Sequence, residues 1–172
     1  MVEDRTDAAM AALVEEAAKK SAVLWVQVGD NRDRAAWHVW SSGAVYLVTG
    51  GDEQSVPGLD VAATALVTLR SKDKGGRLLS FVADVSAVEP EGDEWARVVP
   101  ELHAKRLNPR DGEAQPARWA RESRVWRLAP TGDVPQRPGH ISGRSHAGPP
   151  PGSPATTVGP KPLLVGRKPR AR

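Results

Sequence analysis

The chain has 172 residues, of which 40% are hydrophobic and none is cysteine. It is long enough to bury one core, and it can form neither disulfides nor thiolate metal sites. Its net charge of +3 averages two regions, because residues 131–172 hold seven basic residues and one acid, whereas residues 1–130 hold 17 basic and 20 acidic residues. The sequence shows no signal-peptide pattern and no apolar run near the roughly 20 residues that span a bilayer, so we expect a cytoplasmic protein without a membrane span.

The first predicted element is a helix that Thr6 caps and that ends near Lys20. Six segments rich in Val, Leu and Trp follow, and each has the length and composition of a strand. They are residues 22–28, 35–40, 45–48, 65–70, 77–88 and 124–128. The pattern predicts a mainly β fold with flanking helices, either a barrel or a sandwich.

Three short polar connections that contain glycine, at 29–34, 41–43 and 72–76, predict antiparallel hairpins. Two further helices are predicted, a short one at 59–64 and a longer amphipathic one at 93–107. A proline inside the longer helix, Pro100, is expected to kink or divide it.

Residues 131–172 are dense in Pro, Gly and Ser, so burial of apolar surface cannot offset the entropy of ordering them. We therefore predict a domain at 1–130 and a disordered basic tail at 131–172. The terminal RKPRAR could attract phosphates of nucleic acid or of an anionic membrane. Basic residues without interleaved aromatics are a weak signal, so a nucleic-acid partner is not expected and a solvated extension is the simpler interpretation.

The motifs of several large enzyme classes are missing from the sequence. It contains no Gly-x-Gly-x-x-Gly, no Walker loop, no Gly-x-Ser-x-Gly and no His-Glu-x-x-His, which removes the usual support for dinucleotide folds, nucleotide triphosphatases, serine hydrolases and zincins. His38 and His103 lie in separate predicted elements without a carboxylate at ligand spacing. No metal site is expected.

The stretch from Arg34 to Ser55 carries the strongest functional pattern. It reads as two strands joined by a tight turn, and the chain leaves the second strand at Val48-Thr49-Gly50. An Arg at the start and a Thr-Gly exit are suited to a phosphate, because a guanidinium, a hydroxyl and backbone N–H groups all bind phosphate oxygens.

With the elements around it, this stretch resembles the FMN-binding split barrel of the pyridoxamine 5′-phosphate oxidase family over residues 7–130. In that family the second strand opens with an Arg and continues to a Lys, and the loop after the next strand carries Ser-Arg-Lys. Arg34 matches the Arg, whereas the Lys position falls at Val39 and the basic pair at Gln54-Ser55. The ending Arg127-Leu128-Ala129-Pro130 is also similar to the Arg-Leu-x-Pro end of the oxidases. The resemblance implies a six-stranded antiparallel split β-barrel.

The resemblance further implies a homodimer that binds FMN or a deazaflavin coenzyme as its small-molecule ligand and acts as an oxidoreductase. The implied cofactor contacts are Arg34, His38, Trp40, Thr49, Gly50, Gly51, Gln54 and Ser55. No residue is assigned as catalytic. Of the family's basic positions only Arg34 remains, and Asp52 and Glu53 would repel a phosphate unless they point to solvent. The alternative is therefore a split barrel that has lost FMN and serves as a ligand-binding or dimeric interaction module.

Structural interpretations stand beside these functional ones. Arg34 alternatively begins a strand and pairs with Asp30 or Asp33, and Thr49 alternatively caps the Gly-Gly bend. The basic residues between His103 and Arg121 form either an anion site or a helix end followed by a proline-broken loop.

The tryptophans of the second strand have two interpretations as well. Trp37 should lie on the opposite strand face from His38 and Trp40, and it is expected in the core. His38 and Trp40 either stack on a planar ring or lie in a dimer interface.

Overall fold

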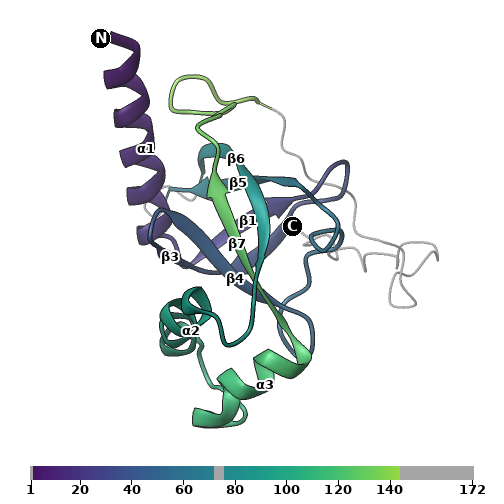
Figure 1. The fold of residues 1–172 in the computed structure, drawn as a ribbon. Coiled ribbons are helices and arrows are strands. Elements are labelled where there is room, and N and C mark those ends of the chain that lie inside the picture. The colour runs from purple at the N-terminus through teal and green to yellow at the C-terminus, as the bar shows by residue number, and fades with distance from the viewer. Residues whose placement is uncertain (1, 72–75, 144–172) are drawn as a thin grey trace, which may run out of the picture.

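The computed structural model describes residues 2–71 and 76–143, which form seven strands, three α-helices and one 3-10 turn (Figure 1). In chain order the elements are α1 (Val2–Lys20), β1 (Val23–Gln27), β2 (Arg34–Trp37), β3 (Val39–Ser41), β4 (Ala44–Thr49), β5 (Thr64–Arg70), β6 (Arg77–Val88), α2 (Asp93–Lys105), η1 (Gly112–Ala114), α3 (Gln115–Glu122) and β7 (Arg124–Pro130). The strands form one antiparallel sheet in the order β2-β1-β5-β6-β7-β4-β3. The prediction of a mainly β antiparallel fold with flanking helices is confirmed, and so are the three hairpins.

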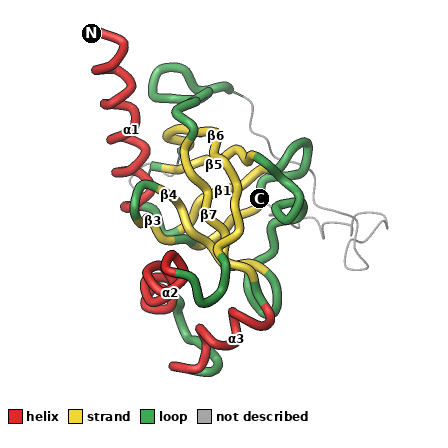
Figure 2. The backbone as a smooth tube through the Cα atoms, in the orientation of Figure 1, coloured by secondary structure: helices red, strands yellow, loops and turns green. Residues whose placement is uncertain are grey.

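The sheet curls into a half-barrel because its two edge strands are consecutive in the chain (Figure 2). Trp37 ends β2 opposite Val23 of β1, and Val39 begins β3 opposite Tyr46 of β4. His38 alone therefore separates the two edges of the sheet. The segment predicted as one strand at 35–40 is divided there, because it leaves one partner strand and joins another. The sheet has seven strands instead of the predicted six for this reason.

Two of the predicted helices differ from the structure: the first helix begins earlier than predicted, and the short helix at 59–64 is absent. α1 begins at Val2, so Thr6 lies inside the helix and does not cap it. Residues 59–64 form hydrogen-bonded turns and the start of β5 instead of a helix. In these turns the N–H of Leu59 donates to the Val56 carbonyl and the N–H of Val61 donates to that of Gly58, both at 3.3 Å, and no run of helical bonds follows.

The two remaining helices pack near the end of the sheet where β4 leads into its loop, below the strands in Figure 1. α2 is not divided, although Pro100 lies inside it. Pro100 and Ala96 are both exposed, so water can satisfy the Ala96 carbonyl that the proline ring leaves without a helical donor. α3 occupies residues expected as a proline-broken loop, and its proline stands in the first turn, where proline is tolerated. No helix of the described residues is long and apolar enough to cross a membrane.

Two hydrophobic clusters use opposite faces of the sheet. β4 shows this directly, because Val45 and Leu47 belong to the cluster inside the curl, which α1 covers, and Tyr46 and Val48 belong to the cluster beneath α2 and α3. Trp40 packs against the first cluster and Trp37 against the second. The prediction that these two tryptophans lie on opposite faces, with Trp37 at a core, is confirmed.

The chain stays attached to the sheet beyond Pro130, where the sequence analysis ends the domain. Past β7 it continues beside β6: the N–H of Thr131 donates to the Val82 carbonyl at 3.0 Å, and the N–H of Ser80 donates to the Gln136 carbonyl at 2.8 Å. The described residues after Pro130 thus remain hydrogen-bonded to the sheet, and the boundary at 130 stays a prediction. Residues 144–172, the greater part of the predicted tail, lie outside the described residues, and their disorder stays a prediction.

Two shortened chains test where the domain ends. A chain that ends at Pro130 loses the hydrogen bonds to β6. Its free energy of unfolding should be about 1–2 kcal/mol lower than that of the full chain, since surface hydrogen bonds are partly replaced by bonds to water. A chain that ends at Gly143 keeps these bonds and should match the full chain. Urea unfolding of the three proteins is the measurement, and equal stability of all three would support the boundary at 130.

Candidate ligand-binding site

The glycine loop, residues 49–55, leaves β4 and turns sharply against the junction of α3 and β7. Gly50 and Gly51 both have positive φ, 84° and 59°, which glycine adopts at little cost. A Cβ on Gly51 would lie 3.2 Å from the Glu122 carbonyl oxygen and from Ser123 Oγ. Ser123 Oγ in turn donates to the Gly50 carbonyl at 3.2 Å. The two glycines are therefore required for the close packing of the loop, whatever ligand it meets.

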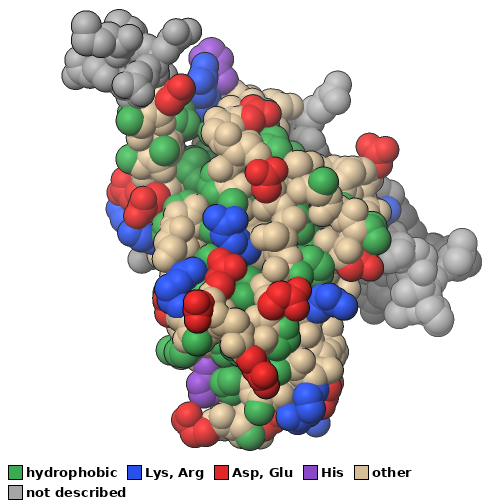
Figure 3. Space-filling model, in the orientation of Figure 1, with side chains coloured by type: hydrophobic (Ala, Val, Ile, Leu, Met, Phe, Trp, Pro, Cys, Tyr) green, Lys and Arg blue, Asp and Glu red, His purple; other side chains and the backbone are tan. Residues whose placement is uncertain are grey.

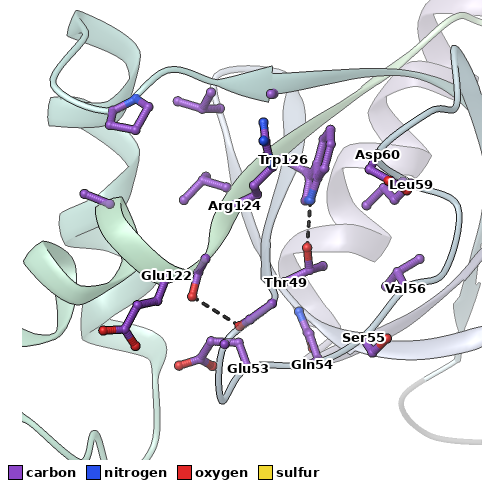
Figure 4. A pocket seen from close by; sticks show the side chains of 18 of the residues that line it. Thr49, Glu53, Gln54, Ser55, Val56, Leu59, Asp60, Glu122, Arg124 and Trp126 are labelled. Atoms are coloured by element: carbon purple, nitrogen blue, oxygen red, sulfur yellow. Dashed lines mark hydrogen bonds between the residues drawn. The ribbon is translucent and has the colours of Figure 1, made fainter.

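A pocket of about 840 Å³ opens beside this loop, and Figure 4 shows it from close by. We call it the glycine-loop pocket, and its walls are residues 49–51, 53–60, 87–90, 95 and 120–126. Trp95 of α2 and Trp126 of β7 contribute aromatic surface. Its size lies within the range of roughly 300–1,000 Å³ that is common for small-molecule sites.

Five of the eight predicted contact residues line this pocket: Thr49, Gly50, Gly51, Gln54 and Ser55. Thr49 Oγ1 accepts a hydrogen bond from Trp126 Nε1 at 2.8 Å, drawn as a dashed line in Figure 4, which leaves its own O–H free to donate. The Gln54 side chain is engaged on both sides, because its Oε1 accepts from the Trp37 N–H at 2.8 Å and its Nε2 donates to the Trp37 carbonyl at 2.9 Å. Gln54 thus attaches the loop to the end of β2.

Arg34 does not line the glycine-loop pocket. It stands exposed at the start of β2, opposite Val26 of β1, and no ion pair joins it to Asp30 or Asp33 in the described part of the chain. Its proposed contact with a phosphate stays a prediction.

His38 and Trp40 line a different pocket, of about 340 Å³, between the end of α1, β3 and α2. His38 is buried, and its Nε2 lies 3.0 Å from the Ala18 carbonyl oxygen, so Nε2 carries the proton. The pKa of His38 is lowered from 6.5 to about 4, chiefly by burial; the hydrogen bond to Ala18 opposes this shift, and the Lys105 charge adds to it. The structure therefore does not bring the eight predicted residues together in one site.

The two carboxylates of the glycine loop are paired with cations, and they differ in burial, because Asp52 is exposed whereas Glu53 is buried. Glu53 has a side chain only 1% exposed, and Arg106 Nε donates to its Oε2 at 3.0 Å. Its Oε1 accepts from Gln115 Nε2 at 2.9 Å and from Trp119 Nε1 at 3.0 Å, with Arg118 at 3.6 Å.

Three of the six basic residues between 103 and 121 pair with carboxylates, and Arg106 is the first of them. Arg110 pairs with Asp52 of the glycine loop, and Arg118 pairs with Asp111 as well as Glu53. On the face drawn in Figure 3, acidic and basic side chains are likewise interspersed. This segment binds the glycine loop, and the interpretation as a free anion site loses its support.

Arg124 and Trp126 at the start of β7 are among the pocket residues that were not predicted from the sequence. They stand two apart in a strand, so their side chains share a face. That alternation is visible in the sequence, but only the sheet order places β7 beside β4 and turns this face toward Thr49. Among the described residues no group of three His, Asp or Glu side chains could hold a metal ion.

This fold is that of the pyridoxamine 5′-phosphate oxidase-like FMN-binding split barrels, and the predicted resemblance is confirmed at the level of the fold. HutZ, the heme storage protein from Vibrio cholerae, matches with a TM-score of 0.53 and 16% identity, over 72% of this chain and 91% of that one. A candidate pyridoxamine 5′-phosphate oxidase from Listeria innocua matches with a TM-score of 0.52 and 14% identity, over 74% and 97%. A candidate 5-nitroimidazole antibiotic resistance protein from Bacteroides thetaiotaomicron matches with a TM-score of 0.51 and 13% identity, over 72% and 81%. By sequence, no family model and no curated protein matches the chain.

Proposed function

We propose that this protein binds a flavin or deazaflavin nucleotide in the glycine-loop pocket and acts as an oxidoreductase. The observation that supports this best is the convergence of Thr49, Gly50 and Gly51 on a pocket of about 840 Å³ that two tryptophans also line. This is the place at which the resemblance to the oxidases expects the cofactor phosphate.

The residues of the pocket fit the two parts of such a cofactor unequally. Apolar and aromatic walls from Val56, Leu59, Trp95 and Trp126 suit a planar ring. The phosphate end has the Thr49 hydroxyl and the backbone of the loop, but it lacks the Lys and the Arg-Lys pair of the oxidases. We therefore expect binding that depends more on the ring than on the phosphate.

The cofactor supplies the electron-transfer chemistry in such a protein, and the chain supplies binding, orientation and exclusion of water. Glu53 holds the glycine loop on α2 and α3 through its buried bonds, and Gln54 holds it on β2. The loop is thereby anchored on two sides before any ligand arrives, which reduces the ordering cost of binding.

The test is a spectrum of the purified protein followed by titration. The full chain, made in a host that synthesises both flavins and deazaflavins, should carry a flavin-type absorbance band and the matching mass. Protein freed of ligand should quench the fluorescence of riboflavin and of FMN. If no such band copurifies and neither flavin binds, the proposal is wrong.

The second candidate is a split barrel without flavin that binds another planar ligand or acts as an interaction module. Its support is the charge of the pocket, because three exposed carboxylates, Asp60, Glu89 and Glu122, outnumber the two arginines of the lining, and Arg34 is not among these. A fold does not determine its ligand, and one protein of this fold is named as a heme storage protein. Copurification of haem instead of flavin would favour this candidate.

We also propose that the protein is a homodimer in which a partner subunit helps to enclose the ligand. The resemblance to the split-barrel oxidases implies such a dimer, in which the second copy completes the cofactor cleft. Light scattering at micromolar concentration should give twice the mass of 18.4 kDa. A monomer would restrict the proposed site to the residues of this chain.

A further inference from the structure

Arg124 begins β7 at the rim of the glycine-loop pocket. In the sheet it stands directly opposite Thr49, the last residue of β4. Directly opposite residues place their side chains on the same face, with Cβ atoms about 5 Å apart. Trp126, two residues further on, lies on that face as well and bonds to Thr49 through its indole N–H. All three side chains line the pocket, and Figure 4 labels them.

The guanidinium of Arg124 is available, unlike the other cations near the loop. Arg106, Arg110 and Arg118 pair with carboxylates, and Arg121, the other basic residue of the lining, donates to the Ala117 carbonyl of its own helix at 2.9 Å. Arg124 is exposed, and within residues 2–71 and 76–143 its guanidinium has no hydrogen-bond or ion-pair partner.

We propose that Arg124 is the cation that binds the phosphate group of the ligand, in the role that the sequence analysis gives to Arg34. The inference rests on the proposed function, since it places the phosphate at the glycine loop. Arg124 stands opposite Thr49, whose hydroxyl hydrogen is free, so a phosphate at this point receives a charge-assisted bond and a hydroxyl bond from neighbouring strands.

Glu122 places a negative charge near the proposed phosphate position, and its removal gives a second, independent test of the inference. It also lines the pocket, and its Cβ lies 3.6 Å from the position that a Cβ on Gly51 would take, next to the glycine loop. A carboxylate at that place repels a phosphate. Removing its charge should therefore strengthen the binding that removal of Arg124 weakens.

The experiment titrates FMN and riboflavin, which differ by the phosphate alone, into four forms of the full chain. Arg124→Gln should weaken FMN binding by about tenfold or more and leave riboflavin within about twofold, as expected for one charge-assisted hydrogen bond. Glu122→Gln should tighten FMN selectively. Arg34→Ala is the matched control, an exposed arginine outside the pocket, and should change neither affinity.

Each other outcome is decisive. If Arg124→Gln weakens FMN no more than riboflavin, or if Arg34→Ala alone weakens FMN, Arg124 is not the phosphate contact, although the proposed function stands. If wild type binds neither flavin, the proposed function is wrong. The role of Arg124 is then tested with inorganic phosphate as the probe instead of FMN. Addition of phosphate should shift the NMR amide signals of Gly50 and Gly51 in wild type and not in Arg124→Gln. Equal shifts in the two proteins, or no shift in wild type, would overturn the inference.

Discussion

Replacement of Glu53 by Gln is expected to lower the free energy of unfolding by about 3–5 kcal/mol, the range for breaking a buried ion pair by removing one partner. The Glu53 side chain is 1% exposed. Its carboxylate faces Arg106 and Arg118, whose side chains are 28% and 11% exposed. Glutamine keeps the volume but removes the charge, so two largely desolvated guanidinium groups lose their common partner. The bonds from Gln115 and Trp119 become weaker bonds to an amide oxygen.

Asp52→Asn is the matched control, because it neutralises the neighbouring carboxylate of the same loop. Asp52 and its partner Arg110 have side chains 55% and 72% exposed, and an exposed pair contributes at most about 1 kcal/mol. Urea unfolding of the two variants, with equal denaturant slopes, is the measurement. Equal losses in both would show that the pairing of Glu53 does not anchor the glycine loop to α2 and α3.

The stability of the protein is expected to fall by about 2 kcal/mol between pH 7.5 and pH 5 through His38 alone. Burial lowers the pKa of His38 from 6.5 to about 4 in the folded chain. Between these values the unfolded state binds the proton and the folded state does not. The stability that depends on neutral His38 is therefore fully present above pH 6.5. It is lost as the pH falls from 6.5 toward 4, and below pH 4 it changes no further.

The site explains why the charged form is disfavoured. His38 Nε2 already donates to Ala18, Nδ1 is buried without a partner among the described residues, and Lys105 adds a like charge from α2. His38 lies between the two edges of the sheet, so a protonated ring there would place an unpaired buried charge at the junction of β2 and β3. Urea unfolding of wild type and of His38→Gln at both pH values isolates this effect, because the other titrating groups cancel in the difference. A difference that does not change with pH would contradict the lowered pKa.

The sequence by itself determined the local features of this protein. Alternation of apolar residues, with glycine in the short connections, predicted each hairpin correctly, because side-chain period and turn geometry depend on neighbouring residues. It also indicated the Thr49-Gly50 exit, since the sharp turn there requires glycine within a few residues of the strand end. The division of the strand at His38 was missed, because it depends on which strands the segment meets on either side.

Only the tertiary structure decided which distant residues meet at the site. Arg124 faces Thr49 because β7 lies beside β4 in the sheet, and Glu53 meets Arg106 and Arg118 because α2 and α3 pack under the glycine loop. Arg34, the cation that the local pattern favours, is on a strand whose position in the curl leaves it outside the pocket. Such pairings join segments separated by many residues and follow from the closure of the sheet and the burial of two cores, which no local pattern encodes.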